Sequence, residues 1–124
     1  MDSKNILVVD DDLAILDALG LVLEAEGYQV QLLPYGDKVF ENIGDYFPDL
    51  IILDVMLGNV DGGLLCNLLN TTEGLKDIPV IMISANAEMK YILAKTCPNS
   101  DFLEKPFEID QLLSLVKTRL NTLV

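Results

Sequence analysis

Short apolar runs alternate with longer amphipathic segments along the chain. The runs are continuous rather than alternating, and such runs are typical of strands that are buried on both faces of a sheet. They cover residues 5–9, 28–33, 50–53, 80–83 and 102–103.

The segments between these runs have helical periodicity. In residues 13–26 the apolar side chains recur at three- and four-residue spacing, and Gly27 follows at the position where glycine commonly ends a helix. Further helices are expected over residues 37–46, 64–70, 87–96 and 108–120. The glycine- and asparagine-rich stretch VMLGNVDGG is expected to be a loop.

Strands that alternate with helices predict a parallel sheet covered on both faces, with right-handed crossovers. Five such units fit into 124 residues, and we find no repeat, linker or low-complexity segment. The expectation is one α/β domain over residues 1–124.

The composition and the first residues of the sequence indicate the cellular location to expect. No stretch reaches the roughly 20 apolar residues that span a bilayer, and the polar start MDSKN does not resemble a signal peptide. We therefore expect a cytoplasmic protein that does not associate with membranes. Its two cysteines, Cys66 and Cys97, are then expected to be buried, reduced thiols.

The net charge and the lack of histidine disfavour nucleic acid as a partner and limit the kinds of metal site. The formal net charge is −12, which disfavours direct contact with nucleic acid because phosphate backbones are bound by lysine and arginine. The chain has no histidine, so a metal site would use oxygen ligands and favour a hard cation.

The ends of the predicted strands carry the polar residues. Ligands of open α/β sheets bind beyond the carboxyl ends of the strands. Those ends hold Asp10–Asp12, Asp54, Ser84 and Lys105. Two carboxylates about 4 Å apart repel by about 4 kcal/mol at an effective dielectric constant near 20, so a cluster of them calls for a cation such as Mg²⁺.

Mg²⁺, an ammonium group and a hydroxyl group all suit phosphoryl oxygens. Carboxylates can accept a phosphoryl group as aspartyl phosphates. Asp54 is the best acceptor, because it stands alone at the end of the predicted central strand.

Four motifs, in order and at matching spacing, resemble the receiver domain of two-component response regulators, including the single-domain chemotaxis type. They are ILVVDDD, DLIILDVMLGNVDG, DIPVIMISA and DFLEKPF. The resemblance spans essentially the whole chain and implies a flavodoxin-like, doubly wound sheet of five parallel strands, in the order 2-1-3-4-5, with five helices.

The resemblance also implies roles for individual residues. Asp10 and Asp11 would form the acidic metal pair, Asp54 would be phosphoacceptor and metal ligand, and Met56 would give its backbone carbonyl to Mg²⁺. Ser84 and Lys105 would bind the phosphoryl group. Phe102 would be the switch aromatic, and the Lys105–Pro106 peptide bond would be cis.

The implied function is a phosphorylation-activated switch. A sensor histidine kinase or a histidine phosphotransfer protein would phosphorylate Asp54, and the face of helix four, strand five and helix five would change to control an unknown partner. Ser84 would move inward, and Phe102 would fill the space it leaves. Such a domain is not a dedicated enzyme, but it phosphorylates itself from small phosphodonors and dephosphorylates itself with Mg²⁺.

Three positions depart from the family pattern. Leu57-Gly58 replaces the usual Met-Pro, which should loosen that loop, and Pro98-Asn99-Ser100 replaces the usual Gly-Ala-Asp. Leu115 occupies the place of an arginine that bridges dimers of many DNA-binding regulators. We therefore expect a stand-alone regulator or a receiver from a larger protein such as a hybrid kinase, either monomeric or a phosphorylation-dependent dimer.

Other interpretations remain. Asp12 is expected to cap the following helix rather than bind metal, and Asp61 to lie in a loop or start a helix. One alternative function is an aspartyl-phosphate phosphohydrolase, although those enzymes have a second aspartate where this chain has Met56. Another is a receiver that binds its partners without phosphorylation.

Overall fold

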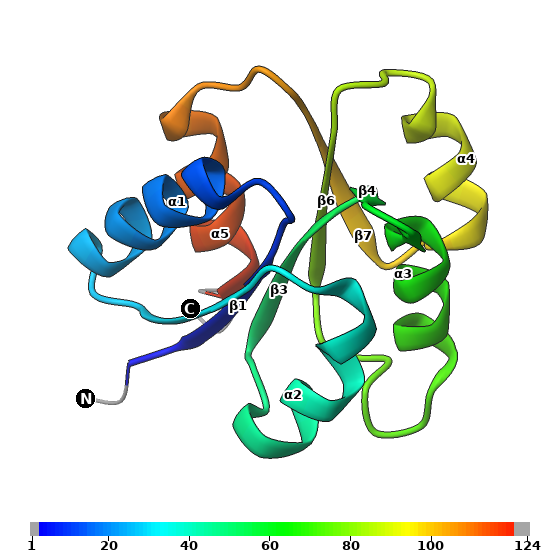
Figure 1. Cartoon of the computed structure of the whole chain (residues 1–124), viewed down its shortest axis with the longest axis horizontal. Helices are drawn as coiled ribbons and strands as arrows, with labels where there is room; N and C mark the ends of the chain where they lie inside the picture. Colours follow the sequence, from blue (N-terminus) through cyan, green and yellow to red (C-terminus); the bar gives the residue numbers. More distant parts are fainter. Residues whose placement is uncertain (1–2, 121–124) are drawn as a thin grey trace.

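The computed structural model describes residues 3–120 and contains a five-stranded parallel sheet (Figure 1). Its strand order is β2-β1-β3-β6-β7, which is 2-1-3-4-5 when only the strands of this sheet are counted. This confirms the predicted doubly wound fold. The strands are β1 (Asn5–Val9), β2 (Gln29–Leu33), β3 (Leu50–Asp54), β6 (Val80–Ser84) and β7 (Ser100–Glu104).

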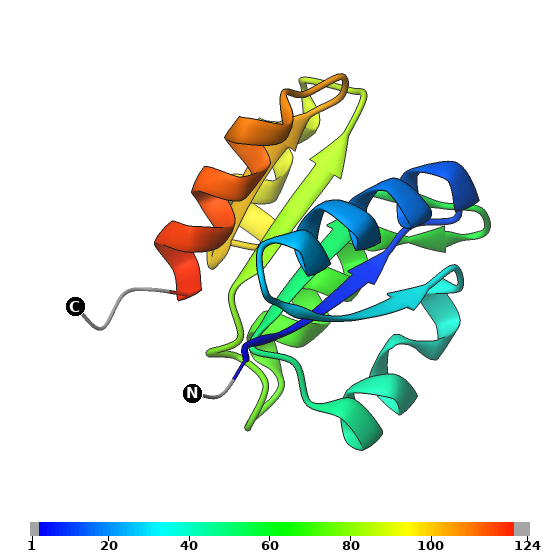
Figure 2. The same ribbon diagram turned by 90° about the vertical axis from the view of Figure 1, so that its left-hand side faces the viewer.

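Helices cover both faces of the sheet (Figures 1 and 2). One face carries α1 (Leu13–Ala25) and α5 (Ile109–Leu120). The other face carries α2 (Val39–Tyr46), which follows the short 3₁₀ helix η1 (Gly36–Lys38), together with α3 (Gly62–Thr71) and α4 (Met89–Thr96).

The alternation of side chains along each strand divides the core into two layers. In β1, Ile6 and Val8 pack with α1 and α5, whereas Leu7 and Val9 pack on the side of α2, α3 and α4. All four are almost completely buried, as expected for a strand that is covered on both faces. The continuous apolar runs therefore supply both layers at once.

Most predicted boundaries agree with the structure within a few residues. Gly27 follows α1 with a φ of 93°, in the left-handed region that favours glycine at this position. No helix within residues 3–120 has the length and apolar character needed to cross a membrane.

The expected loop after β3 contains a small hairpin. β4 (Met56–Leu57) pairs antiparallel with β5 (Val60–Asp61). Gly58 stands first in the turn with a φ of 62°, a value that proline cannot adopt. Gly58 therefore suits the turn of this hairpin.

The prediction of two reduced thiols is wrong in this structure. Cys66 of α3 and Cys97, which follows α4, form a disulfide with their Cα atoms 5.7 Å apart. The two residues are 31 positions apart in sequence, and only the packing of α3 beside α4 brings them together.

Candidate functional site

Three carboxylates meet at the carboxyl ends of β1 and β3. Asp10 and Asp11 follow β1, and Asp54 is the last residue of β3. These strands are neighbours, with Val9 paired to Leu53. One oxygen from each of Asp10, Asp11 and Asp54 lies within 4.8 Å of the other two, so the predicted cluster is assembled.

The members of the cluster differ in exposure. Asp10 and Asp54 are buried, whereas Asp11 is exposed. Burial raises the pKa of Asp10 to about 6, and the nearby charge of Asp54 adds to this, although the hydrogen bond that Asp10 accepts from the Asp12 backbone N–H opposes the rise. Ionisation of Asp10 at neutral pH therefore costs more free energy than ionisation of an exposed aspartate.

Lys105 supplies one positive charge to the cluster. Its Nζ lies 2.9 Å from Asp54 Oδ2 and 3.2 Å from Asp10 Oδ2. Burial would lower the pKa of Lys105, but the hydrogen bond to Asp54 and the charges of both aspartates outweigh it and raise that pKa. The Lys105–Pro106 peptide bond that follows β7 is cis.

Three carboxylates and one ammonium leave negative charge at the site. Asp10, Asp11 and Asp54 present oxygen atoms only, which suits Mg²⁺ better than a softer metal. The donor set thus fits the predicted cation.

Ser84 lies at the end of β6, the strand next to β3. The pairing of Asp54 with Ile83 places Ser84 at the same sheet edge as the carboxylates. Ser84 is 2% exposed, and its Oγ accepts a hydrogen bond from the backbone N–H of Asn86 at 3.0 Å. The hydroxyl group is thus connected to the segment that leads into α4.

Phe102 lies deeper in the sheet, in β7 opposite Met82. It is partly buried and packs on the side of the core that α2, α3 and α4 cover. Ser84 occupies the same strand as Met82 two residues later, so Ser84 and Phe102 belong to the same face of the sheet. The two residues thus share a face of the sheet, and the switching role of Phe102 stays a prediction.

The hairpin after β3 is tied closely to Asp54. Asp54 Oδ1 accepts a hydrogen bond from the Met56 N–H at 3.1 Å, while the Met56 side chain is exposed. Gly62 donates its N–H to the Val55 carbonyl at 2.8 Å. A Cβ on Gly62 would overlap the Asp54 carbonyl group and lie 2.9 Å from Val55 Cα.

Sequence reasoning missed Gly62 and Asn86 as neighbours of the site. Gly62 and Gly63 are adjacent, and nothing in the sequence distinguishes the one that contacts Asp54. Asn86 contacts Ser84 through its backbone, so its side-chain type carries no signal of that contact.

Asp12 and Asp61 are helix caps. Asp12 Oδ1 accepts hydrogen bonds from the N–H groups of Ala14 and Ile15 at the start of α1. Asp61 Oδ1 does the same for Gly63 and Leu64 at the start of α3. This confirms the prediction that both aspartates have a structural role.

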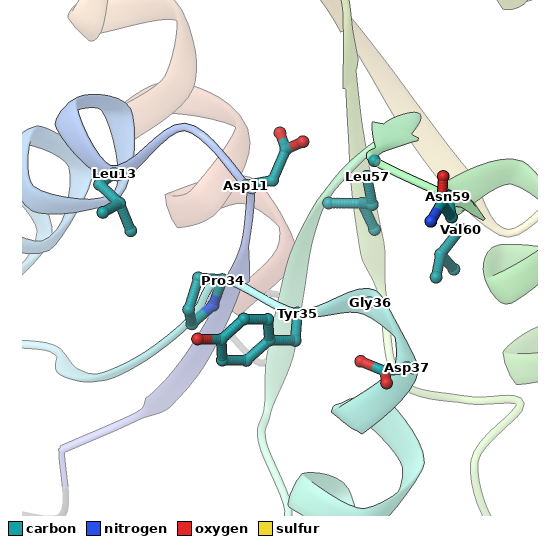
Figure 3. A pocket seen from close by; sticks show the side chains of 10 residues that line it. Asp11, Leu13, Pro34, Tyr35, Gly36, Asp37, Leu57, Asn59 and Val60 are labelled. Carbon is teal, nitrogen blue, oxygen red and sulfur yellow. The ribbon is translucent and has the colours of Figure 1, made fainter.

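An open hollow of about 470 Å³ lies between the β1–α1 connection, the segment after β2 and the β4–β5 hairpin (Figure 3). Asp11 lines it from the β1–α1 connection, Tyr35 from the segment after β2, and Asn59 from the hairpin. Among the three clustered carboxylates, Asp11 is the one that lines this hollow. A solute from solvent would therefore meet Asp11 before Asp10 or Asp54.

Comparison with known proteins identifies the family. The family model described as the response regulator receiver domain matches residues 6–117. A DNA-binding dual master transcriptional regulator, RpaA of Synechocystis sp., is 39% identical over 94% of this chain and 48% of its own length. The DNA-binding response regulator MtrA of Mycobacterium tuberculosis is 30% identical over 94% of the chain and 50% of its own length. The chain thus spans about half the length of these relatives.

Solved structures agree over nearly the whole chain. A putative response regulator from Chloroflexus aurantiacus superimposes with a TM-score of 0.89 at 32% identity, covering 97% of this chain and 99% of that one. The signal receiver domain of a signal transduction histidine kinase from Syntrophus aciditrophicus gives 0.89 at 31% identity, covering 98% and 92%. The chain belongs to the family of response regulator receiver domains.

Proposed function

We propose that this domain is a switch turned on by phosphorylation of Asp54. The observation that carries the proposal is the convergence of Asp10, Asp11 and Asp54 within 4.8 Å, with Lys105 bonded to two of them. Membership of a two-component signalling family supports it.

In the proposed transfer, an oxygen of Asp54 attacks the phosphorus of a phosphohistidine. The new O–P bond forms as the N–P bond to the donor's imidazole breaks. Asp10, Asp11, Asp54 and the Met56 carbonyl would hold Mg²⁺, which supplies positive charge for the phosphoryl oxygens. Lys105, already 2.9 Å from Asp54, would pair with one of those oxygens.

The switch would act through Ser84. An aspartyl phosphate adds negative charge, and the Ser84 hydroxyl would turn toward it and donate a hydrogen bond. That turn would break the bond from Asn86 N–H to Ser84 Oγ and free the segment before α4. Phe102 would then move toward the space that Ser84 leaves.

The proposed partners follow from this role. A histidine kinase or a histidine phosphotransfer protein would donate the phosphoryl group, and a protein that binds the face of α4, β7 and α5 would read the change. We propose a cytoplasmic location and no direct contact of this domain with nucleic acid, since its net charge is −12.

The test is phosphorylation by acetyl phosphate in the presence of Mg²⁺, measured as a phosphoryl increment in intact mass. We expect the increment in the native protein and none in Asp54→Asn. Asp61→Asn is the matched control, because it changes a helix cap in the same loop and should leave labelling intact.

Lack of labelling in the native protein, or labelling that persists in Asp54→Asn, would contradict the proposal. Sustained hydrolysis of phosphate esters would instead favour a phosphohydrolase.

A further inference from the structure

The helix α4 is weakly held to the rest of the domain. It has eight residues, of which Leu93 alone is buried, and no side chain caps its first turn. Met89 adds a partly buried contact with the core. With so little apolar burial, a helix belongs to the part of a structure that opens most readily.

The C-terminal end of α4 is nevertheless fixed to α3. Cys97, the residue after the helix, is bonded to Cys66, and both are fully buried. Asn67 of α3 donates from Nδ2 to the Thr96 carbonyl at 2.7 Å, and Asn70 Oδ1 accepts from the Asn99 N–H at 2.9 Å. The disulfide is the single covalent bond in this set.

The N-terminal end of α4 is connected to the phosphorylation site instead. Ser84 Oγ accepts from the Asn86 N–H. Asn86 Oδ1 accepts in turn from the Glu88 N–H, and the Asn86 backbone carbonyl accepts from the Met89 N–H at the start of α4. The helix thus has one end that follows Ser84 and one end that is bonded to α3.

We propose that the redox state of Cys66 and Cys97 determines how far α4 moves when Asp54 is phosphorylated. The inference rests on the function proposed above. In the oxidised protein α4 can only pivot about Cys97, so the change stays near residues 85–90. In the reduced protein the whole helix can shift, and the change reaches residues 93–99.

The chemistry is thiol–disulfide exchange with a dithiol reductant. A thiolate of the reductant attacks one sulfur of the pair and releases the other as a thiolate. The second thiol of the reductant then displaces the first cysteine. The reductant leaves as a cyclic disulfide, and the protein keeps two thiols after proton uptake.

The proposed location favours a switch over a permanent crosslink. Both cysteines are inaccessible to solvent, so a reductant reaches them only when α4 opens. In a reducing compartment such as the proposed cytoplasm, protein disulfides are usually transient and often sense redox conditions.

The experiment compares the oxidised and the dithiothreitol-reduced protein (residues 1–124), each with and without Mg²⁺ and acetyl phosphate. Alkylation followed by intact mass counts the thiols and the phosphoryl group in each sample. Hydrogen–deuterium exchange then follows residues 85–99. On phosphorylation, we expect faster exchange over residues 93–99, by about tenfold or more, in the reduced sample alone.

On phosphorylation, the double variant Cys66→Ala/Cys97→Ala should show the same change in hydrogen exchange as the reduced protein, and dithiothreitol should not alter that change. If that variant fails to fold, the comparison of the oxidised and reduced native protein still tests the inference. Two results would overturn this inference and leave the proposed function standing. One is alkylation of the cysteines before any reductant is added, and the other is equal hydrogen exchange in the oxidised and reduced samples after phosphorylation. Absence of phosphorylation in both redox states would overturn the proposed function, and this inference with it.

Discussion

The three consecutive aspartates after β1 have different surroundings, and these surroundings separate their roles. Asp10 is buried beside Lys105 and Asp54, Asp11 is exposed in the hollow, and Asp12 caps α1. The sequence alone indicated that Asp12 differs, because a preferred capping residue stood directly before a helical pattern. It did not indicate how unequally Asp10 and Asp11 are buried.

The first prediction separates Asp11 from Asp12. Asp12→Ala should lower the free energy of unfolding by about 1 kcal/mol, because two N–H groups of α1 lose their acceptor, and should leave phosphorylation intact. Asp11→Ala should abolish Mg²⁺-dependent phosphorylation. Urea unfolding and acetyl phosphate labelling measure the two effects, and equal loss of labelling in both variants would contradict the assignment.

The second prediction concerns Asp10 in the metal-free protein. Asp10→Asn should raise the free energy of unfolding at pH 7 by about 1–2 kcal/mol, because it removes a charge that burial penalises. In the same variant, Mg²⁺ binding should weaken.

The pH dependence follows from the direction of the shift. The pKa of Asp10 is raised from 3.8 to about 6 in the folded state, so its charge costs stability as pH rises through that window. The advantage of Asp10→Asn should therefore shrink as pH falls below about 6. Urea titrations in EDTA at several pH values test this, and an advantage that persists at low pH would refute the explanation.

At the scale of elements, continuous apolar runs predicted the central strands β1, β3 and β6 well because these strands are buried on both faces. The edge strands β2 and β7 are only partly buried. β1 agrees residue for residue. The β4–β5 hairpin was missed, since strands of two residues have no periodicity to detect. The disulfide was missed because Cys66 lies in α3 and Cys97 follows α4, and no local pattern encodes how these two helices pack.

The third prediction tests how the hairpin positions Asp54. Gly62→Ala should reduce the rate of phosphorylation by about tenfold or more, because the new Cβ would displace the Asp54 carbonyl and the start of the hairpin. Gly44→Ala is the matched control, since nothing lies within 4 Å of its added Cβ and alanine favours the helix.

Circular dichroism would verify that both variants fold. A folded Gly62→Ala protein that is phosphorylated at the native rate would show that this close approach does not position Asp54.

At the scale of the whole molecule, the chain has a formal net charge of −12, and three of its carboxylates lie close together at the site. Repulsion among like charges opposes the compact state. Screening by salt and specific binding of a cation should both reduce this repulsion. The two effects can be distinguished because screening does not depend on any particular residue.

The fourth prediction uses that distinction. Raising NaCl from about 10 to 150 mM shortens the Debye length from about 30 to 8 Å and should raise the melting temperature of every variant. MgCl₂ at matched ionic strength should raise it further in the native protein but not in Asp11→Ala, because only a bound ligand stabilises by linkage. An equal response of both proteins to Mg²⁺ would argue against the site.

The parallel sheet has a consequence for when the site forms during folding. The groups of the site come from β1, β3, β6 and the segment after β7, which adjoin only once the crossovers are complete. A nascent or truncated chain that lacks the last strand has no Lys105 beside Asp54. Under the proposed function, phosphoryl acceptance would therefore be confined to molecules in which all five strands of the sheet have assembled.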